Sequence, residues 1–350
     1  MTDAVPPHVA ARHHALAPEH VDAPHRWWEA GDLQLESGAR VERCGVSWVE
    51  HGIEDPGGER TILGCTAIGA THHRLDFLIG PGRALDTTRF RIVVVDALGN
   101  GLSTSPSNSA TQPGPGFPRF TIGDMVAAQH RLLVERLGLR RVFAVAGASM
   151  GGMQALEWGV RHPGFCERIV AMTPMARTAP WARAINEAAR RALMGDPAFA
   201  GGRYEAQPAR GWRDWAVIMR VLGARTPEAL AAMEDFDGWF RATVDGTLAA
   251  NIDANDWIAQ SHAYDAHDVA RGPRLGGDLA AALASVRARL LVAAPPLDLY
   301  NPVACAREAA ALVPGARFAE IPSGFGHNAA TSADPAAAAF LDAEIARFLA

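Results

Sequence analysis

A serine, an aspartate and a histidine that lie far apart in the chain each follow a segment with the pattern of a buried strand. Ser149 is the middle residue of GASMG (residues 147–151), a G-x-S-x-G pattern between an apolar run at 142–146 and a helix-like stretch. Glycines on both sides of a serine permit the sharp, strained strand-to-helix turn that exposes a nucleophilic hydroxyl. We therefore predict that Ser149 is a nucleophile, since a glycine-rich packing turn alone does not explain a serine at its tip.

Asp298 and His327 supply the groups that activate a serine. Asp298 follows the apolar run 289–293, and His327 lies in the loop SGFGHN after a short strand-like segment at 318–321. A histidine can take the serine proton and later return it, while a carboxylate orients and charge-balances the imidazole. The chain order Ser, Asp, His is that of the α/β-hydrolase triad. A structural alternative, with Asp298 as a helix cap and His327 as a turn residue, stays open from the residues alone.

Two backbone N–H groups are candidates for stabilising negative charge on a reacting carbonyl oxygen. Met150 follows the serine at the start of a predicted helix, where the amide has no partner within the helix. Ile68 lies in the loop after the predicted strand 61–67, and α/β-hydrolases take their second donor from the corresponding loop. We predict that the amides of Ile68 and Met150 form the oxyanion hole.

The segments around these residues alternate between strand and helix patterns up to about residue 175. Apolar runs at 91–98, 142–146 and 169–173 are typical of strands buried on both faces of a parallel sheet. Between them, Thr121 is the expected N-cap of a helix that extends to about residue 138, with Asp124 as its capping-box acid. Residues 33–36 and 41–49 predict an antiparallel hairpin at the sheet edge.

We expect an α/β fold with a mostly parallel sheet flanked by helices and one inserted helical lid. The strand–helix alternation stops after Met175 and returns at Arg289. Tryptophans are spread through this insertion, and both an acyl-pocket role and ordinary helix packing are open for them. The predicted units are a flexible N-terminal arm at 1–30, a core at 31–175 and 289–350, and the lid at 176–288.

Composition restricts the class of partner. The 350 residues are 49% hydrophobic and 20% charged with a net charge of -5, and no long basic run is present, which disfavours nucleic acid and anionic membranes. We expect small-molecule substrates and a cytoplasmic location, because neither a leader-like start nor an apolar run of membrane-spanning length is found. The four cysteines lack metal-site spacing, and the histidines near the N-terminus lie in an Ala/Pro-rich setting, so no metal and no bound cofactor are expected.

Four segments make the chain resemble the homoserine O-acetyltransferase family of α/β-hydrolase-fold enzymes, from about Leu33 onward. They are LIGPGRALDTTRF, FTIGDMVAAQHRLL, GASMGGMQALEW and DANDWIAQSHAYDAHDVARG, which begin at residues 78, 120, 147 and 253. The resemblance implies a ping-pong reaction in which Ser149 accepts an acyl group, usually acetyl from acetyl-CoA, and passes it to a hydroxyl in a tunnel beneath the lid. It also implies a homodimer formed through the lid.

The sequence departs from this family where an amino-acid substrate would be held. The family's Gly-His-Asp motif, whose Asp is associated with the amine of homoserine, is replaced by Gly326-His327-Asn328. The family's lid arginine for the substrate carboxylate falls on Val217, although Arg213 and Arg220 lie within one turn. We therefore name Asn328, Arg213 and Arg220 as candidate substrate contacts and expect an acceptor other than homoserine.

These observations lead to two enzymatic hypotheses and one non-enzymatic one. The favoured hypothesis is an O-acyltransferase that moves an acetyl or other short acyl group from acyl-CoA, its co-substrate, to a hydroxyl. The alternative is a carboxylic-ester hydrolase that uses the same acyl-serine with water as acceptor. A catalytically silent scaffold is the third hypothesis, and an intact set of Ser149, Asp298 and His327 argues against it.

Overall fold

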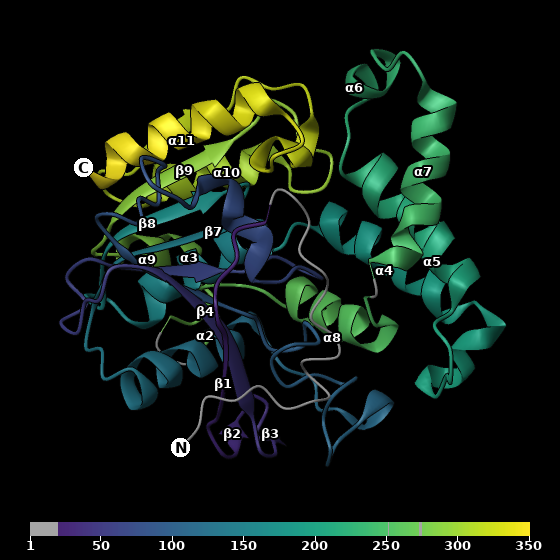
Figure 1. Cartoon of the computed structure of the whole chain (residues 1–350), viewed down its shortest axis with the longest axis horizontal. Coiled ribbons are helices and arrows are strands. Elements are labelled where there is room, and N and C mark those ends of the chain that lie inside the picture. Colours follow the sequence, from purple (N-terminus) through teal and green to yellow (C-terminus); the bar gives the residue numbers. More distant parts are fainter. Residues whose placement is uncertain (1–19, 251, 273–274) are drawn as a thin grey trace.

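The computed structural model describes residues 20–250, 252–272 and 275–350, and a twisted sheet forms its centre (Figure 1). In the described part of the chain, eight strands pair in the order β1-β4-β6-β5-β7-β8-β9-β10. The strands β1 and β4 are antiparallel to their neighbours, and all pairs from β6 to β10 are parallel. Their bounds are β1 His25–Glu29, β4 Gly45–Gly52, β5 Thr61–Cys65, β6 Arg91–Val95, β7 Val142–Ala148, β8 Cys166–Met172, β9 Arg289–Ala294 and β10 Arg317–Glu320.

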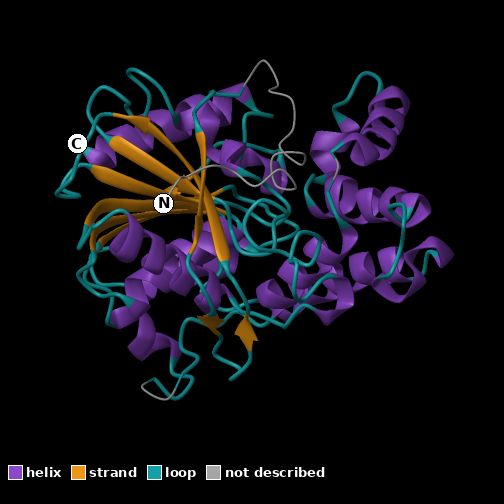
Figure 2. Cartoon of the chain, turned by 60° about the horizontal axis from the view of Figure 1, so that its bottom comes forward, coloured by secondary structure: helices purple, strands orange, loops and turns teal. Residues whose placement is uncertain are grey.

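Helices cover both faces of this sheet (Figure 2). One apolar cluster joins the sheet to α2 (Ile122–Arg131), α3 (Met150–Arg161), α9 (Leu279–Ala284) and α10 (Val303–Leu312). On the other face, a second cluster joins it to η1 (His72–Leu78) and α11 (Pro335–Leu349). Because β5, β7, β8 and β9 lie between these layers, nearly all their residues are buried, as their continuous apolar runs predict. The predicted parallel α/β core is confirmed.

The first core helix begins where its capping residues predict. Thr121 accepts a hydrogen bond from the amide of Asp124, and the Asp124 carboxylate accepts one from the amide of Thr121, so the capping box is complete. The helix α2 then continues as one π-helical segment, η3 (Leu132–Arg136). In the segment before α2, at 99–118, the only regular element described is the short η2 (Gly114–Gly116).

The insertion between β8 and β9 forms a helical layer beside the core, on the right of Figure 1. Its elements are α4 Pro180–Met194, η4 Pro197–Gly202, α5 Ala209–Ala216, η5 Val217–Gly223, α6 Pro227–Ala231, α7 Phe236–Ala249 and α8 Ala254–Asp265. The lid predicted for 176–288 is therefore present, but it is shorter than predicted. The last helix of that range, α9, packs against the core helix α10.

The N-terminal part differs from the prediction of a loose arm at 1–30. Residues 1–19 lie outside the described part, but residues 25–29 form β1, which pairs with β4 from His25 opposite Val49 to Glu29 opposite Gly45. The predicted hairpin is reduced to β2 (Leu33–Gln34) and β3 (Arg40–Val41), and the rest of its second arm is the sheet strand β4. The alternating pattern indicated strands correctly, while the choice of partner depended on contacts distant in sequence.

None of the helices in the described ranges is long and apolar enough to serve as a membrane span.

The two glycines around Ser149 allow backbone segments to touch. A Cβ on Gly147 would lie 2.2 Å from the carbonyl oxygen of Gly151, and a Cβ on Gly151 would lie 2.3 Å from the carbonyl oxygen of Cys65 in β5. Both contacts are with backbone atoms, which cannot move aside as the end of a flexible side chain can. The G-x-S-x-G pattern is therefore required by the close approach of β5, β7 and α3.

We expect Gly151→Ala to lower the free energy of unfolding by about 2 kcal/mol, because overpacking against fixed atoms typically costs about 1–3 kcal/mol. Urea denaturation followed by circular dichroism measures this change. Gly246→Ala is the matched control, since a Cβ at this exposed position in α7 meets nothing within 4 Å. That variant should be neutral or up to about 1 kcal/mol more stable. Equal effects of the two variants would contradict the steric account of the turn.

Candidate active site

Ser149, His327 and Asp298 meet at the carboxyl edge of the sheet. The Oγ of Ser149 lies 2.8 Å from Nε2 of His327, and Nδ1 of the same ring lies 2.8 Å from Oδ2 of Asp298. Because an ionised carboxylate only accepts hydrogen bonds, Nδ1–H donates to Asp298 and Nε2 is left to accept the proton of the serine hydroxyl. The three residues that the sequence predicts as a triad thus have the hydrogen bonding that serine activation requires.

The backbone at Ser149 has the strained conformation that the glycine pattern predicts. The serine has φ 57° and ψ -124°, between the end of β7 at Ala148 and the start of α3 at Met150. Its amide donates to the carbonyl of Met172 in the neighbouring strand β8 at 2.9 Å, which holds the turn in place. Such a positive φ in a non-glycine residue persists only where the surrounding packing enforces it. The strain therefore positions Oγ toward His327 rather than along the strand.

The acid of the triad is fixed by its own loop. Oδ1 of Asp298 accepts the amide N–H groups of Tyr300 and Asn301, both at 2.9 Å, which leaves Oδ2 for His327. The ring of Tyr300 packs edge-on against the imidazole with 5.0 Å between centroids. The Tyr300 hydroxyl donates to Asn186 in α4, so this loop is also tied to the lid. The imidazole is held by both an ionic partner and an aromatic neighbour.

The loop after β5 brings Ile68 beside Ser149. Ala67, Ile68 and Gly69 line the same small cavity as Ser149 and His327. In the described part of the chain no acceptor lies within hydrogen-bond reach of the Ile68 amide, whereas the Gly69 amide donates to Oε1 of Gln260 at 2.8 Å. This arrangement leaves the two amides predicted as oxyanion donors, those of Ile68 and Met150, available for a substrate oxygen.

A network of polar side chains supports this loop from the core side. Asp96 at the end of β6 accepts the His72 amide through Oδ1 and the His72 imidazole through Oδ2, and Asn100 bridges Asp96 to the carbonyl of Ala70. The pKa of His72 is raised by the neighbouring Asp96 despite the opposing effect of burial. His25, His72 and Asp96 have ligand atoms within 4.8 Å of one another, close enough to share a metal ion. In this structure their hydrogen bonds tie η1 and the oxyanion loop to the sheet.

The catalytic cavity has a volume of about 170 Å³ and contains residues from both core and lid. Asn328 and Arg220, two of the predicted substrate contacts, line it together with His327. The third predicted contact, Arg213, does not line it. Arg213 is half exposed on α5 and pairs with Asp245 of α7, which points it along the lid surface. Seven positions, about two helical turns, therefore separate an arginine that lines the cavity from one that does not.

Some tryptophans of the lid line the catalytic cavity, and others pack against neighbouring side chains. Trp215 and Trp257 line the catalytic cavity and cross at 84° with 5.4 Å between ring centroids, whereas Trp212 packs edge-on behind Trp215. Trp239 stacks on Arg225, which also lies over Phe325 in the loop that carries the catalytic histidine. Trp215 and Trp257 therefore lie where an acyl pocket was predicted, whereas Trp212 and Trp239 pack against other side chains.

Several residues that support the site were missed in the sequence. Gln260 belongs to a recognised motif, DANDWIAQ, but only the fold shows that its amide group bridges Gly69 and the carbonyl of Leu98. Arg74 follows two histidines in a segment without a recognisable motif, yet it lines the catalytic cavity. Their partners lie far away in the chain, so no spacing in the sequence could reveal these contacts.

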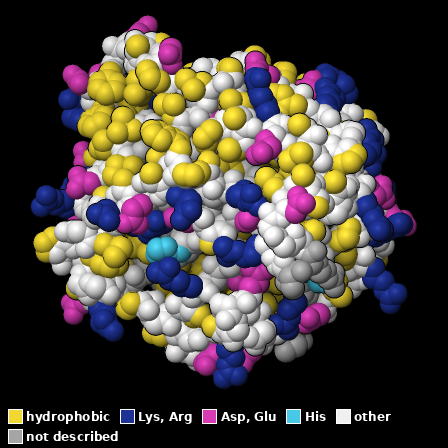
Figure 3. All heavy atoms as spheres, turned by 180° about the vertical axis from the view of Figure 1, so that it is seen from behind, with side chains coloured by type: hydrophobic (Ala, Val, Ile, Leu, Met, Phe, Trp, Pro, Cys, Tyr) yellow, Lys and Arg dark blue, Asp and Glu magenta, His cyan; other side chains and the backbone are white. Residues whose placement is uncertain are grey.

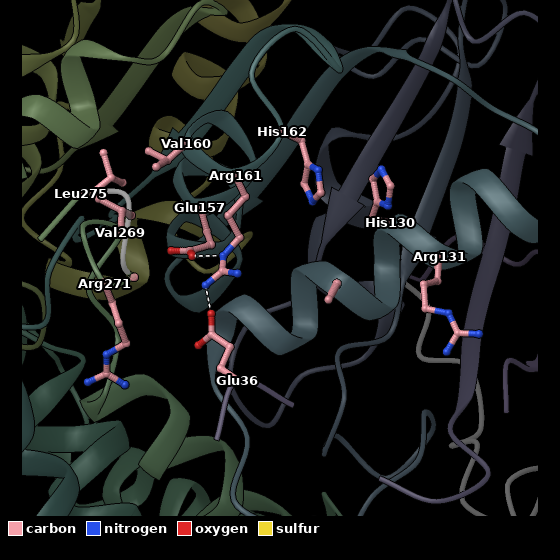
Figure 4. A pocket seen from close by; sticks show the side chains of 12 residues that line it. Glu36, His130, Arg131, Glu157, Val160, Arg161, His162, Val269, Arg271 and Leu275 are labelled. Atoms are coloured by element: carbon pink, nitrogen blue, oxygen red, sulfur yellow. Dashed lines mark hydrogen bonds and ion pairs between the residues drawn. The ribbon is translucent and has the colours of Figure 1, made fainter. Parts of the chain in front are cut away.

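A larger cavity of about 450 Å³ lies at the other end of α3 from Ser149 (Figure 4). Arg161 in this cavity bridges the carboxylates of Glu157 and Glu36, and the stacked rings of His130 and His162 form another wall. Burial raises the pKa of Glu157 to about 7, even though Arg161 opposes the shift. No residue of the triad lines this cavity, so it is separate from the candidate active site.

Comparison with known families agrees with this fold. A sequence model described as the alpha/beta hydrolase fold matches residues 65–245. The ethyl acetate hydrolase of Pseudomonas veronii is 32% identical over 329 residues, which cover 91% of this chain and 93% of that protein. The homoserine O-succinyltransferase of Leptothrix cholodnii is 32% identical over 345 residues, which cover 87% of this chain and 90% of that protein.

Solved structures share the fold of this chain. An acetyl esterase, MekB, matches with a TM-score of 0.88 and 31% identity over 93% of this chain and 96% of that one. The homoserine O-acetyltransferase from Bacillus anthracis matches with a TM-score of 0.82 and 24% identity over 93% and 97% of the two chains, a likeness of fold.

We expect a fluorophosphonate probe to label this protein at Ser149 alone, and Ser149→Ala to abolish labelling. His327→Ala and Asp298→Asn should slow labelling at least about a hundredfold, because the hydroxyl loses its proton acceptor or the imidazole takes the wrong tautomer. Time courses of labelling, read by intact-protein mass spectrometry, measure these rates. His162→Gln, which changes a histidine of the separate cavity, should label at the wild-type rate. Labelling that persists in Ser149→Ala would contradict the assignment.

Proposed function

The chain belongs to the α/β-hydrolase fold family, in the group that contains homoserine O-acyltransferases and acetyl-ester hydrolases, and on that premise we propose that it hydrolyses short-chain carboxylic esters through an acyl-Ser149 intermediate. The three triad side chains carry the chemistry. The small volume of the catalytic cavity, about 170 Å³, supports a short acyl group. The sequence alone favours an O-acyltransferase, with the ester hydrolase as the alternative. The proposal places the hydrolase first.

The reaction runs in two acyl-transfer steps. Oγ of Ser149 attacks the ester carbonyl while its proton moves to Nε2 of His327, and the resulting oxyanion is stabilised by the amides of Ile68 and Met150. The tetrahedral intermediate then expels the alcohol, which takes the proton from His327. In the second step a water molecule attacks the acyl carbonyl while its proton moves to His327. Expulsion of the serine Oγ, which regains a proton from His327, gives the carboxylic acid and free Ser149. Asp298 stays ionised throughout and stabilises the imidazolium.

One observation carries the choice of water over an amino-acid acceptor: among the described residues, no aspartate or glutamate lines the catalytic cavity. Homoserine carries an ammonium group, and burying an unpaired charge is costly. Asn328, next to His327 in the cavity, offers only an amide where a carboxylate would be needed. An uncharged acceptor meets no such penalty, and water is always present. The ethyl acetate hydrolase and the acetyl esterase among the relatives support the same choice.

Acyl transfer from acyl-CoA to another alcohol is the second candidate. A cavity of about 790 Å³, here called the outer cavity, shares Gly69, Ala70, Arg74, Arg220 and Ile252 with the catalytic cavity. This connection supports a route for a donor much larger than the acyl group itself. The homoserine O-acyltransferases at 31–32% identity support transfer in the same way. Acyl-CoA is then a co-substrate rather than a bound cofactor.

Purified protein should release p-nitrophenol from p-nitrophenyl acetate in plain buffer, and L-homoserine should leave the rate unchanged. Ser149→Ala should lower kcat at least about a thousandfold, because the acyl acceptor is lost. Ser285→Ala, at an exposed serine of the core, is the matched control and should keep the wild-type rate. Free thiol released from acetyl-CoA only when an alcohol is present would instead establish the transferase.

We also propose that the protein is a homodimer that associates through the lid and works in the cytoplasm. Hydrophobic side chains gather on one end of the molecule in Figure 3, on the side of the lid. The lid exposes Leu222 by 60% and Phe236 by 39%, and clustered exposed apolar side chains are typical of association surfaces. Among the described residues all four cysteines are free thiols, as expected in a reducing compartment.

Light scattering coupled to gel filtration should give twice the chain mass for the wild type and one chain mass for the double variant Leu222→Asp, Phe236→Asp. Charged groups placed in an apolar interface oppose its burial. Val134→Asp is the control, because Val134 is an apolar residue outside the lid that is 38% exposed, close to the 39% of Phe236. It should keep the dimer. A monomeric wild type, or a dimer that survives the double variant, would reject the lid interface.

A further inference from the structure

We propose that the cavity of about 450 Å³ at the far end of α3, here called the α3 cavity, is a second ligand site that binds a small uncharged molecule with an apolar body and one hydroxyl group. The hydroxyl pairs with the carboxylate of Glu157, and the apolar body packs on the side chains beside it. The inference does not depend on the proposed ester hydrolysis, because no residue of the triad lines this cavity.

A buried carboxylate oxygen without a hydrogen-bond partner points to a ligand. Glu157 lines the α3 cavity and is 2% exposed. Its Oε1 accepts a hydrogen bond from Nε of Arg161, whereas its Oε2 has no partner among the described residues. Nδ1 of His267 lies 3.7 Å from Oε2, which is beyond hydrogen-bond distance. A buried acceptor without a donor costs free energy that a ligand hydroxyl recovers on binding.

The side chains near this carboxylate form an apolar wall. Val160 of α3 lies on the same side of Arg161 as Glu157 in Figure 4, together with Val269 and Leu275 from the segment between α8 and α9. The cavity volume of about 450 Å³ lies within the range that is usual for small-molecule sites. A ligand that fits these surroundings is apolar over most of its length and polar at the end that meets Oε2.

The charges that line the cavity are paired, which disfavours a charged ligand. Arg161 bridges the carboxylates of Glu157 and Glu36, and Arg131 pairs with Glu135. An ammonium group at Oε2 would be repelled by the guanidinium of Arg161, which contacts the same carboxylate. A ligand carboxylate would meet the negative charge of Glu157. An uncharged donor avoids both repulsions.

The other polar side chains of the cavity are also compatible with an uncharged ligand. The rings of His130 and His162 stack with 4.1 Å between their centroids. Burial lowers the pKa of both, that of His162 to about 4, so this wall is neutral near pH 7. Arg271 is exposed, so water solvates its charge.

A hydroxyl group matches both protonation states of Glu157. Burial raises the pKa of this side chain to about 7, so the acid and the carboxylate are both populated near neutral pH. Because Oε1 accepts from Arg161, Oε2 is the oxygen that carries the proton in the acid form. Oε2 therefore accepts a hydrogen bond in one form and donates one in the other. A hydroxyl can donate or accept in turn, whereas an ammonium group only donates.

The first test compares ligands that share a phenyl ring. 2-Phenylethanol should bind, and its methyl ether should bind at least about fivefold more weakly, because the ether has no donor and leaves Oε2 unpaired. The 2-phenylethylammonium cation and the phenylacetate anion should also bind more weakly than the alcohol. Ligand-observed NMR titrations at pH 7 measure the dissociation constants. Equal affinities for the alcohol and the ether, or tighter binding of either ion, would overturn the proposed ligand class.

Variants of the cavity test where the alcohol binds. Ala127→Phe in α2 and Val160→Phe in α3 each place a ring in the cavity and should weaken binding of 2-phenylethanol at least about tenfold. Glu157→Met keeps the length of the side chain but removes the acceptor, so the alcohol and the ether should then bind equally. Ala304→Phe, at an exposed alanine of α10 outside the cavity, should bind the alcohol as the wild type does.

Circular dichroism checks that each variant is folded, and a crystal of the wild type soaked with 2-phenylethanol gives a result that needs no variant. Density for the alcohol should lie beside Glu157, with the hydroxyl within hydrogen-bond distance of Oε2. Binding that survives both filling variants, or density only in another cavity, would reject the α3 cavity as the site.

Discussion

The hydrogen bond between Ser149 and His327 joins side chains that are 178 positions apart, and much of the remaining architecture serves to keep it at 2.8 Å. The serine is presented by a strained turn that is possible only because β5, β7 and α3 approach at glycines. The histidine is held by Asp298, whose second oxygen is occupied by two amides of its own loop. A hydroxyl becomes a useful nucleophile only when both positions are fixed together, since proton transfer requires hydrogen-bond reach.

The lid is the second constraint, because it builds part of the site rather than only covering it. Gln260 of α8 accepts the Gly69 amide and donates to the carbonyl of Leu98, so a lid residue fixes the loop that carries Ile68. Tyr300, beside the catalytic histidine, is bound through its hydroxyl to Asn186 of α4. Changes in the lid are therefore expected to affect the reacting groups as well as the choice of substrate.

The side chains that line the catalytic cavity differ from those that an amino-acid acceptor needs, since among the described residues none of them is an acid. The triad creates the same acyl-serine in a hydrolase and in a transferase, so the acceptor is decided by what the cavity holds in place. In this chain Asn328 takes the position next to His327, and Arg74 and Arg220 supply positive charge from the core and the lid. The resemblance to homoserine O-acyltransferases therefore extends to the fold further than to the residues that line the cavity.

The sequence by itself determined the parallel core and the helical insertion, and it singled out Ser149, Asp298 and His327, whose side chains the structure places within hydrogen-bond distance. These features follow from local patterns: apolar runs on buried strands, glycines at a tight turn, and polar residues just past strand ends. Tertiary structure alone decided that residues 25–29 pair with β4, that α9 belongs to the core, and that Arg220 reaches the cavity while Arg213 points along the lid surface. Those outcomes depend on contacts between segments distant in the chain, and the direction of a side chain on a lid helix changes by about 100° from one residue to the next.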